Sequence, residues 1–298
     1  LKNKSFKFAS FGDSFVFCRY VKNNQTWQNY LSKSSKSNGL NFGVGNYGLD
    51  QIYLKYSSTN IPKNIKTVYI GFVPETLSRC LSSWKHYQEF NNIYAFKPKF
   101  NLKNKKLILR NNPIQSMKDF DKIEKLINEL KKSEFFYEEK FLKYKLSFPY
   151  LISFMKNIKH NYNLIFFSFL KILNINQNKI YDFIINTNCK KNDYYFTKKK
   201  NTDLIYKLLL SIDRISKKKN HKLVFLIFPQ KYDLSIKNKA YQKFFLRIKN
   251  KFNVIDFTEI FQKDDVKKLY LEGKYGGHLT SYGNKVVAQT ILKKRLIN

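Results

Sequence analysis

The stretch KFASFGDSF, residues 7–15, decides the fold because it joins a β-prone run to a sharp turn. The run stops at Gly12, which permits the turn, and Asp13 can cap the segment that follows. Ser14 then stands at the boundary between a strand and a helix, where the scaffold holds a side chain exposed. This segment alone leaves two interpretations open: a positioned nucleophile, or a serine that only caps a helix.

Strand-like and helical segments alternate on either side of this sequence's middle region. Before residue 98, the apolar pattern predicts strands over 7–11, 40–42 and 66–72 and helices over 26–33 and 49–56. After residue 201, it predicts strands over 222–228 and 252–256 and helices over 202–216, 240–251 and 281–295. Such alternation with short connections predicts an α/β fold, in which a parallel sheet is flanked by helices.

The middle region, residues 98–201, is rich in lysine, asparagine and aromatic residues. Helical segments are expected at 116–132 and around 164–173. We interpret this region as a helical insertion within a single domain that spans residues 1–298, where it forms a lid or a partner surface.

The formal net charge of +35 would attract any polyanion. The lysines, however, are spread along the chain beside many asparagine, isoleucine, phenylalanine and tyrosine residues, a mixture that an AT-rich genome produces. Short lysine runs such as 198–200 and 217–219 usually form solvated surface. We therefore expect no specific nucleic-acid partner, while contact with an anionic glycan or a membrane surface is compatible with the charge.

The three cysteines are odd in number and lack metal-ligand spacing, so we expect reduced thiols, no metal and no cofactor. The sequence contains no run of about twenty apolar residues, so we expect no transmembrane helix. A basic segment followed by an apolar run, the pattern that indicates a signal peptide, is not found at the start of this sequence. These features favour a cytoplasmic location.

Two further loops carry groups that a nucleophilic serine needs. NFGVGNYGLDQ, residues 41–51, places three glycines after an expected strand, so its backbone amides can point into a cleft and hold an oxyanion. An ordinary glycine-rich turn is the alternative. In YGGHLTSYGNKVVAQ, residues 275–289, His278 precedes the last expected helix. A lone histidine is more often structural, yet His278 alone among the four histidines lies in a glycine-flanked loop that opens a helix.

Together these blocks resemble the SGNH/GDSL hydrolase family. FGDSF resembles its nucleophile block, NFGVGNYGLDQ its glycine block, and GGHLTSYGN with KVVA its C-terminal histidine block, in the family's order. The resemblance covers about residues 6–79 and 222–293. It implies a flavodoxin-like three-layer α/β/α sandwich with the site at the C-terminal edge of the sheet. It also implies an ester hydrolase or acyltransferase that works through an acyl-serine intermediate.

The resemblance implies roles for four residues. Ser14 would be the nucleophile and would also offer its backbone amide to the oxyanion. His278 would be the general base, then the acid for the departing alcohol. The family's glycine-block donor falls near Asn46, beside Gly45, and asparagine tolerates a left-handed backbone better than most residues.

The chain departs from the family where an oxyanion donor and an acid are expected. The strand end IGFVPET, residues 70–76, has no asparagine donor, a loss of roughly 3–4 kcal/mol of transition-state stabilisation unless it is replaced. Gly276 and Tyr275 occupy the usual places of the acid. A carboxylate from elsewhere, or a backbone carbonyl that orients a Ser–His dyad, are the alternatives. The candidate carboxylates are Glu272, Asp265 and Asp256.

Further candidates to orient the site or bind substrate are Asp13, Tyr275, Glu75 and Arg79; the last two either bind substrate or form a surface ion pair. The segments WKHYQEF (84–90) and FKPKF (96–100) suit a wall on which sugar rings stack, with plain hydrophobic packing as the alternative. We therefore expect an acylated small molecule or glycan as substrate, such as the O-acyl groups of a surface polysaccharide. The alternatives are a degenerate scaffold that binds a glycan or partner without turnover, and a polyanion-binding protein.

Overall fold

The computed structural model describes residues 6–89, 92–158, 162, 165–166, 169–170, 172–173, 177–273 and 277–294. The chain forms two compact units. The sheet unit contains Leu1–Arg79 and Tyr181–Asn298, and the inserted unit contains Cys80–Ile180. The inserted unit thus begins and ends earlier in the sequence than the insertion expected at 98–201.

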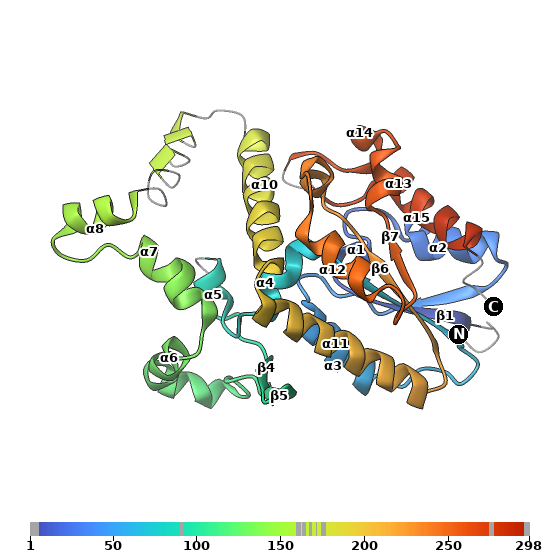
Figure 1. Cartoon of the computed structure of the whole chain (residues 1–298), viewed down its shortest axis with the longest axis horizontal. Coiled ribbons are helices and arrows are strands. Elements are labelled where there is room, and N and C mark those ends of the chain that lie inside the picture. The colour runs from blue at the N-terminus through green and yellow to red at the C-terminus, as the bar shows by residue number, and fades with distance from the viewer. Residues whose placement is uncertain are drawn as a thin grey trace. The chain divides into compact units, whose positions relative to one another are not determined.

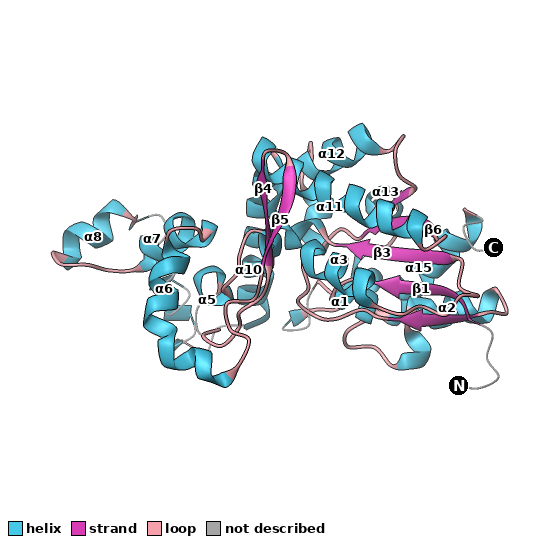
Figure 2. Cartoon of the chain, turned by 90° about the horizontal axis from the view of Figure 1, so that it is seen from below, coloured by secondary structure: helices cyan, strands magenta, loops and turns pink. Residues whose placement is uncertain are grey.

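Five parallel strands form the central sheet of the sheet unit, in the order β2-β1-β3-β6-β7 (Figure 2). Their bounds are Phe6–Phe11 (β1), Asn38–Asn41 (β2), Thr67–Phe72 (β3), Lys222–Ile227 (β6) and Val254–Asp256 (β7). Every residue of the central strand β3 is buried, as a strand covered on both faces requires. The expected parallel α/β fold is confirmed.

Helices flank this sheet as two packed pairs (Figure 1). One pair is α2 (Trp27–Ser34) with α15 (Ser281–Lys293), and the other is α3 (Leu49–Ser58) with α11 (Lys199–Lys218). Phe8 of β1 belongs to the same buried cluster as Trp27, whereas the Phe11 ring lies 5.2 Å from the ring of Tyr56 in α3. Because strand side chains alternate between faces, β1 contributes to both layers of a three-layer sandwich.

The structure describes further helical elements in the sheet unit, which have nine residues or fewer apart from α10, whose first four residues belong to the inserted unit. They are α1 (Ser14–Phe17), η1 (Asn23–Gln25), η2 (Pro74–Thr76), α4 (Leu77–Cys80), α10 (Gln177–Phe196), η5 (Lys231–Ser235), α12 (Ala240–Ile248), α13 (Thr258–Gln262) and α14 (Val266–Leu269). In the part of the chain that the structure describes, no helix combines the length and apolar character needed to cross a membrane.

The inserted unit combines a hairpin with short helices. Strands β4 (Lys99–Lys103) and β5 (Lys106–Arg110) pair antiparallel, and both residues of their two-residue turn have positive φ, as such hairpins require. The helical elements are α5 (Lys85–Gln88), η3 (Met117–Lys122), α6 (Ile123–Lys131), η4 (Tyr137–Phe141), α7 (Leu142–Tyr144) and α8 (Tyr150–Lys156). Of the helix expected around 164–173, several residues lie outside those described.

Aromatic side chains expected to form a sugar-stacking wall lie inside the inserted unit instead. Trp84 is buried and stacks on Phe96 with ring centroids 5.2 Å apart, and Tyr87 is buried against Trp84 and Phe141. Their faces are therefore covered by protein, which supports the hydrophobic-packing alternative for this segment.

Candidate active site

Ser14 lies at the turn that joins β1 to α1. An added side-chain carbon at Gly12 would come within 2.2 Å of Val16, so glycine allows α1 to pack closely against the strand end. Asp13 caps α1, because its Oδ1 accepts a hydrogen bond of 2.9 Å from the N–H of Phe15. Ser14, which is buried, is thus the first residue of a capped helix, and its own N–H has no partner within that helix.

His278 comes from the loop before α15 and reaches Ser14. The distance between His278 Nε2 and Ser14 Oγ is 3.0 Å, within hydrogen-bond reach. Two backbone hydrogen bonds hold the chain at and just after His278: Leu271 N–H donates to His278 O, and Thr280 N–H donates to Leu269 O, each at 2.9 Å. The imidazole packs against the rings of Phe15 and Tyr20, at centroid distances of 5.6 and 5.2 Å. The structure therefore brings together two groups that are 264 residues apart in sequence.

Only glycine fits at position 277, directly before His278. Its φ of +82° lies in the left-handed region, and an added carbon would come 2.2 Å from Oε1 of Gln230. Gln230 is buried, and its Oε1 has no hydrogen-bond partner among the described residues. Gln230 follows β6 and belongs to no motif, so nothing in the sequence distinguishes it.

The glycine-rich loop, residues 43–48, lies against the turn that holds Ser14. The N–H of Val44 donates to the carbonyl of Gly12 at 2.9 Å, and an added carbon at Gly43 would meet the backbone N of Phe17 at 2.3 Å. Asn46 is exposed with a φ of +67°, the left-handed conformation that asparagine tolerates. At Gly45, an added carbon would meet nothing within 4 Å. The roles of Asn46 and Gly45 as oxyanion donors remain predictions.

Arg79 connects the two loops. Its Nη1 lies 3.4 Å from Oδ2 of Asp13 and donates to the carbonyl of Tyr47 at 3.2 Å. Burial raises the pKa of Asp13, and the Arg79 charge opposes that rise. The ion pair of Arg79 is therefore with Asp13, the residue next to Ser14. Glu75 is half-buried in η2, where its charge contributes to raising the pKa of the Cys189 thiol.

The expected third donor and the expected acid have no direct replacement at their family positions. Val73 follows β3, at the place where the resemblance described above would put an asparagine, and it is buried in the apolar core. Asp256 accepts hydrogen bonds from both the N–H and the hydroxyl of Thr258, and Asp265 accepts from Lys267 N–H at 3.0 Å. Glu272 is exposed. Tyr275 lies outside the described residues, and the orienting group for His278 remains a prediction.

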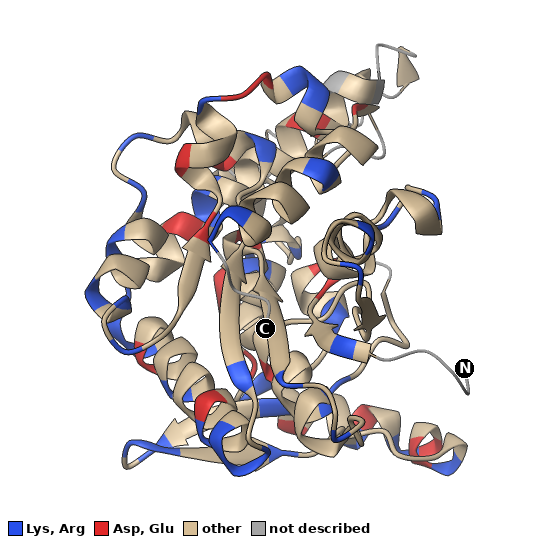
Figure 3. Ribbon diagram, turned by 90° about the vertical axis from the view of Figure 1, so that its right-hand side faces the viewer, with Lys and Arg blue, Asp and Glu red and all other residues tan. Residues whose placement is uncertain are grey.

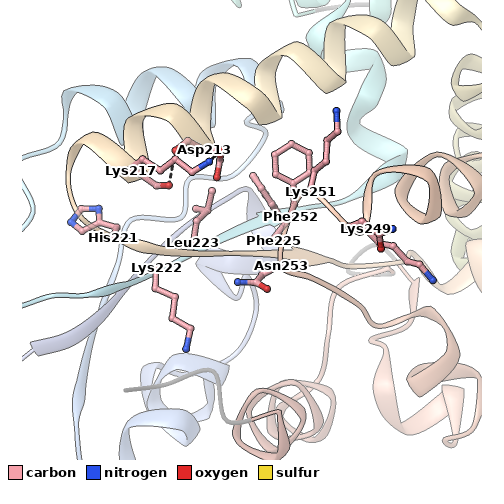
Figure 4. A pocket seen from close by; sticks show the side chains of 12 residues that line it. Asp213, Lys217, His221, Lys222, Leu223, Phe225, Lys249, Lys251, Phe252 and Asn253 are labelled. Carbon is pink, nitrogen blue, oxygen red and sulfur yellow. Dashed lines mark hydrogen bonds and ion pairs between the residues drawn. The ribbon is translucent and has the colours of Figure 1, made fainter.

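A separate cavity of about 330 Å³ lies at the amino end of β6 (Figure 4). Its lining includes Lys217, Lys222, Lys249 and Lys251, and Lys217 is paired with Asp213 at 2.7 Å. None of the predicted site residues lines it. In parallel sheets, functional sites usually lie at the carboxyl ends of the strands, where Ser14 is found.

Neither a protein-family model nor a curated protein matches this chain. Solved structures do resemble it. A candidate lipolytic protein of the G-D-S-L family from Desulfitobacterium hafniense is 11% identical, covering 97% of this chain and 98% of the other, with a TM-score of 0.42. A member of the same family from Veillonella parvula is 12% identical, covering 97% of each chain, with a TM-score of 0.43. A candidate acylhydrolase from Bacteroides fragilis is 13% identical, covering 99% of this chain and 90% of the other, with a TM-score of 0.39. At these values the similarity assigns no reaction, so the chemistry is inferred from the geometry of this chain's own residues.

Proposed function

We propose that this chain is a serine hydrolase that cleaves a carboxylic ester, with Ser14 as nucleophile and His278 as base. The observation that carries the proposal is the 3.0 Å distance between Ser14 Oγ and His278 Nε2. A serine hydroxyl is a weak nucleophile until an adjacent base removes its proton, and this contact has the geometry for that transfer. A helix-capping serine has no need of an imidazole at this distance.

The proposed reaction has two halves. Ser14 Oγ adds to the ester carbonyl carbon while His278 Nε2 takes the hydroxyl proton, and the tetrahedral intermediate carries its charge on the former carbonyl oxygen. Its collapse breaks the ester C–O bond, the alcohol leaves with the proton from His278, and an acyl-Ser14 remains. Water then repeats the sequence, giving the carboxylic acid and restoring the Ser14 hydroxyl.

Backbone amides are the proposed support for the oxyanion. The Ser14 N–H stands at the start of a helix, where the dipole favours negative charge, and the left-handed Asn46 would present a second N–H. Arg79 keeps these two loops in contact through Asp13 and Tyr47. We propose that Arg79 thereby positions the donors in the absence of the family's asparagine.

The proposed substrate is an acylated polar molecule. O-acyl groups of a polysaccharide are the class that the family resemblance implies, and transfer to a sugar hydroxyl instead of water would use the same Ser–His pair. A comparison of acetylated oligosaccharides with simple acetyl esters, with the released acid and any transferred acyl group both measured, separates these substrates and acceptors.

Replacement of the nucleophile tests the proposal. Ser14→Ala should lower the hydrolysis of p-nitrophenyl acetate by about 10³-fold or more, because the covalent route is lost, while the urea midpoint stays close to that of the parent. Labelling by a fluorophosphonate should be lost with it. The matched control is Ser58→Ala, which replaces an exposed serine in α3. This variant should keep both the hydrolysis of p-nitrophenyl acetate and the fluorophosphonate labelling. Full hydrolysis by the Ser14 variant would refute the proposal.

A second candidate is a related scaffold that binds an acylated ligand without turnover. The buried Val73 in place of a polar donor favours it, because an unsupported oxyanion is costly. The parent protein decides between the two: this candidate predicts no fluorophosphonate adduct at Ser14 and no burst of p-nitrophenol.

A further inference from the structure

The inserted unit exposes large apolar side chains along one continuous part of its sequence. They begin before α8 and continue after it, with Phe148 at 83% exposure, Leu151 at 74% and Ile172 at 79%. Among the described residues between 140 and 173, the other large apolar side chains that are more than half exposed are Tyr150, Ile152, Met155, Tyr162, Ile165, Phe169 and Leu173. Single exposed apolar residues are ordinary, but a concentrated series marks an interaction surface.

Helix α8, labelled in Figure 1, is an example of an apolar element that is exposed to solvent. Its sequence is YLISFMK, and Tyr150, Leu151, Ile152 and Met155 are all exposed. A helix that is apolar on most of its circumference is normally buried. In this protein α8 lacks an apolar environment among the described residues of the inserted unit.

The same stretch is basic without exception. Between residues 140 and 173 the chain contains no aspartate or glutamate, and its lysines are Lys140, Lys143, Lys145, Lys156, Lys159 and Lys171. Other helices, such as α6 and α11, carry acidic and basic residues together, and Figure 3 shows acidic residues in red and basic residues in blue along the ribbon. A surface that is both apolar and basic is complementary to a partner that is both apolar and negatively charged.

We propose that residues 140–158, the lysine–aromatic segment, dock the protein on an anionic phospholipid membrane surface. The apolar side chains would enter the boundary between headgroups and acyl chains, and the lysines would remain among the anionic headgroups. The binding strength of such a segment is the sum of the apolar area that it buries and the electrostatic attraction of its lysines to anionic lipids. The docking requires none of the proposed catalytic residues.

A second copy of the chain fits this surface poorly. Self-association would bring two segments without a single acidic side chain into contact, between molecules that each carry a net charge of +35. Like charges in contact oppose such an interface. An anionic lipid surface satisfies both the apolar and the electrostatic requirement.

A tryptophan placed on α8 tests insertion directly. The native Trp27 and Trp84 are buried, so Leu151→Trp adds one exposed indole whose emission reports its surroundings. With vesicles of equal parts phosphatidylglycerol and phosphatidylcholine, its emission should shift to the blue and be quenched by brominated acyl chains. Phosphatidylcholine vesicles alone should give a much smaller change. An emission spectrum that does not move with the anionic vesicles would overturn the proposal.

Sedimentation with the same vesicles separates docking from simple charge attraction, which a +35 protein shows with any anionic surface. Phe148→Ser/Leu151→Ser should weaken binding at least tenfold at 0.15 M salt. Lys145→Gln/Lys156→Gln should weaken it by about tenfold or more, since each lysine near such a surface contributes roughly fivefold. The four side chains replaced in these two double variants are exposed, so both variants should keep the fold. A urea titration of each variant checks this.

Matched controls come from the sheet unit. Leu246→Ser replaces a side chain that is 60% exposed, and Lys200→Gln/Lys249→Gln removes two exposed lysines; both should stay within twofold of the parent. If the controls lose as much binding as the segment variants, attraction is general and the proposal fails. It also fails if Leu151→Trp shifts to the blue without vesicles as protein concentration rises, because the occupant is then a second copy.

Discussion

Arg79 shows how one side chain can organise a site that it does not complete chemically. Its guanidinium lies between the Asp13 carboxylate of the turn that holds Ser14 and the Tyr47 carbonyl of the glycine-rich loop. The Asp13 side chain is only 2% exposed, so its charge depends on this partner and on the N–H of Phe15. Removing one partner of a buried pair leaves the other charge uncompensated.

Arg79→Ala should therefore lower kcat/KM for an acetyl ester by roughly tenfold to a hundredfold and the free energy of unfolding by about 1–3 kcal/mol. In an Asp13→Asn background, the same replacement should cost much less stability, because no buried charge is left behind. Urea titrations of the four proteins of this cycle measure the coupling. A stability cost that is equal in both backgrounds would show that the ion pair is unimportant.

At this scale, the sequence could indicate that Ser14 and His278 lie close together, but not what surrounds them. Ser14 and His278 were predictable because each lies at a strand–loop–helix boundary with flanking glycines, and motifs of this kind are local. The partner of Arg79 was not, since Asp13 is 66 residues away and nothing in the sequence favours it over Glu75. Gln230 carries no local signal, and its role beside Gly277 arises only from the tertiary contact.

Among the elements, η5 contains the most unusual carboxyl group. Asp233 is almost completely buried, where its Oδ2 accepts the N–H of Gln230 at 2.8 Å. Burial is the main cause that raises the pKa of Asp233 from 3.8 to about 7, and the nearby Asp193 adds to it. The unfolded chain therefore releases this proton near pH 4, whereas the folded chain keeps it until about pH 7. Asp233 thus lowers the stability progressively between these values.

Asp233→Asn should remove this pH dependence. The asparagine oxygen can still accept the Gln230 N–H, and the stability of the variant relative to the parent should rise between pH 4 and 7 by on the order of 2–4 kcal/mol. Urea unfolding at pH 4.5, 6 and 8 measures the difference, in which the other titrating groups cancel. Asp203→Asn, which removes a half-exposed carboxylate from α11, should show a nearly constant difference. If the Asp233 variant also differs from the parent by a constant amount, the carboxyl group is ionised at all three pH values.

Most elements of the sheet unit were predictable from periodicity, and the exceptions are instructive. The strand expected at 222–228 appears as Lys222–Ile227, because its continuous apolar run suits a strand buried on both faces. The twenty-residue α10 was not predicted, since asparagines and lysines interrupt the apolar spacing of its sequence. Its place comes from tertiary contacts instead, as when Asp193 Oδ1 accepts the N–H of Ala240 at 2.8 Å.

For the whole molecule, the dominant physical quantity is its charge. The chain has 56 lysine and arginine residues against 21 aspartate and glutamate residues, so most cations have no acidic partner even if every acid is paired. Several of the ion pairs in the described part of the chain join helix neighbours four residues apart, which contribute only a few tenths of a kcal/mol each. Net repulsion between like charges therefore opposes the folded state at low ionic strength.

Salt should accordingly stabilise this protein. Between 10 and 300 mM NaCl the screening length shortens to a few ångströms, and we expect the free energy of unfolding to rise by on the order of 1–2 kcal/mol, or Tm by about 2–6 °C. Lys200→Glu/Lys249→Glu, which reduces the net charge at two exposed positions, should show a smaller rise over the same range. A Tm that falls as NaCl is added would mean that attractive pairs outweigh the repulsion. The lysines would then be part of a stabilising network rather than a consequence of composition.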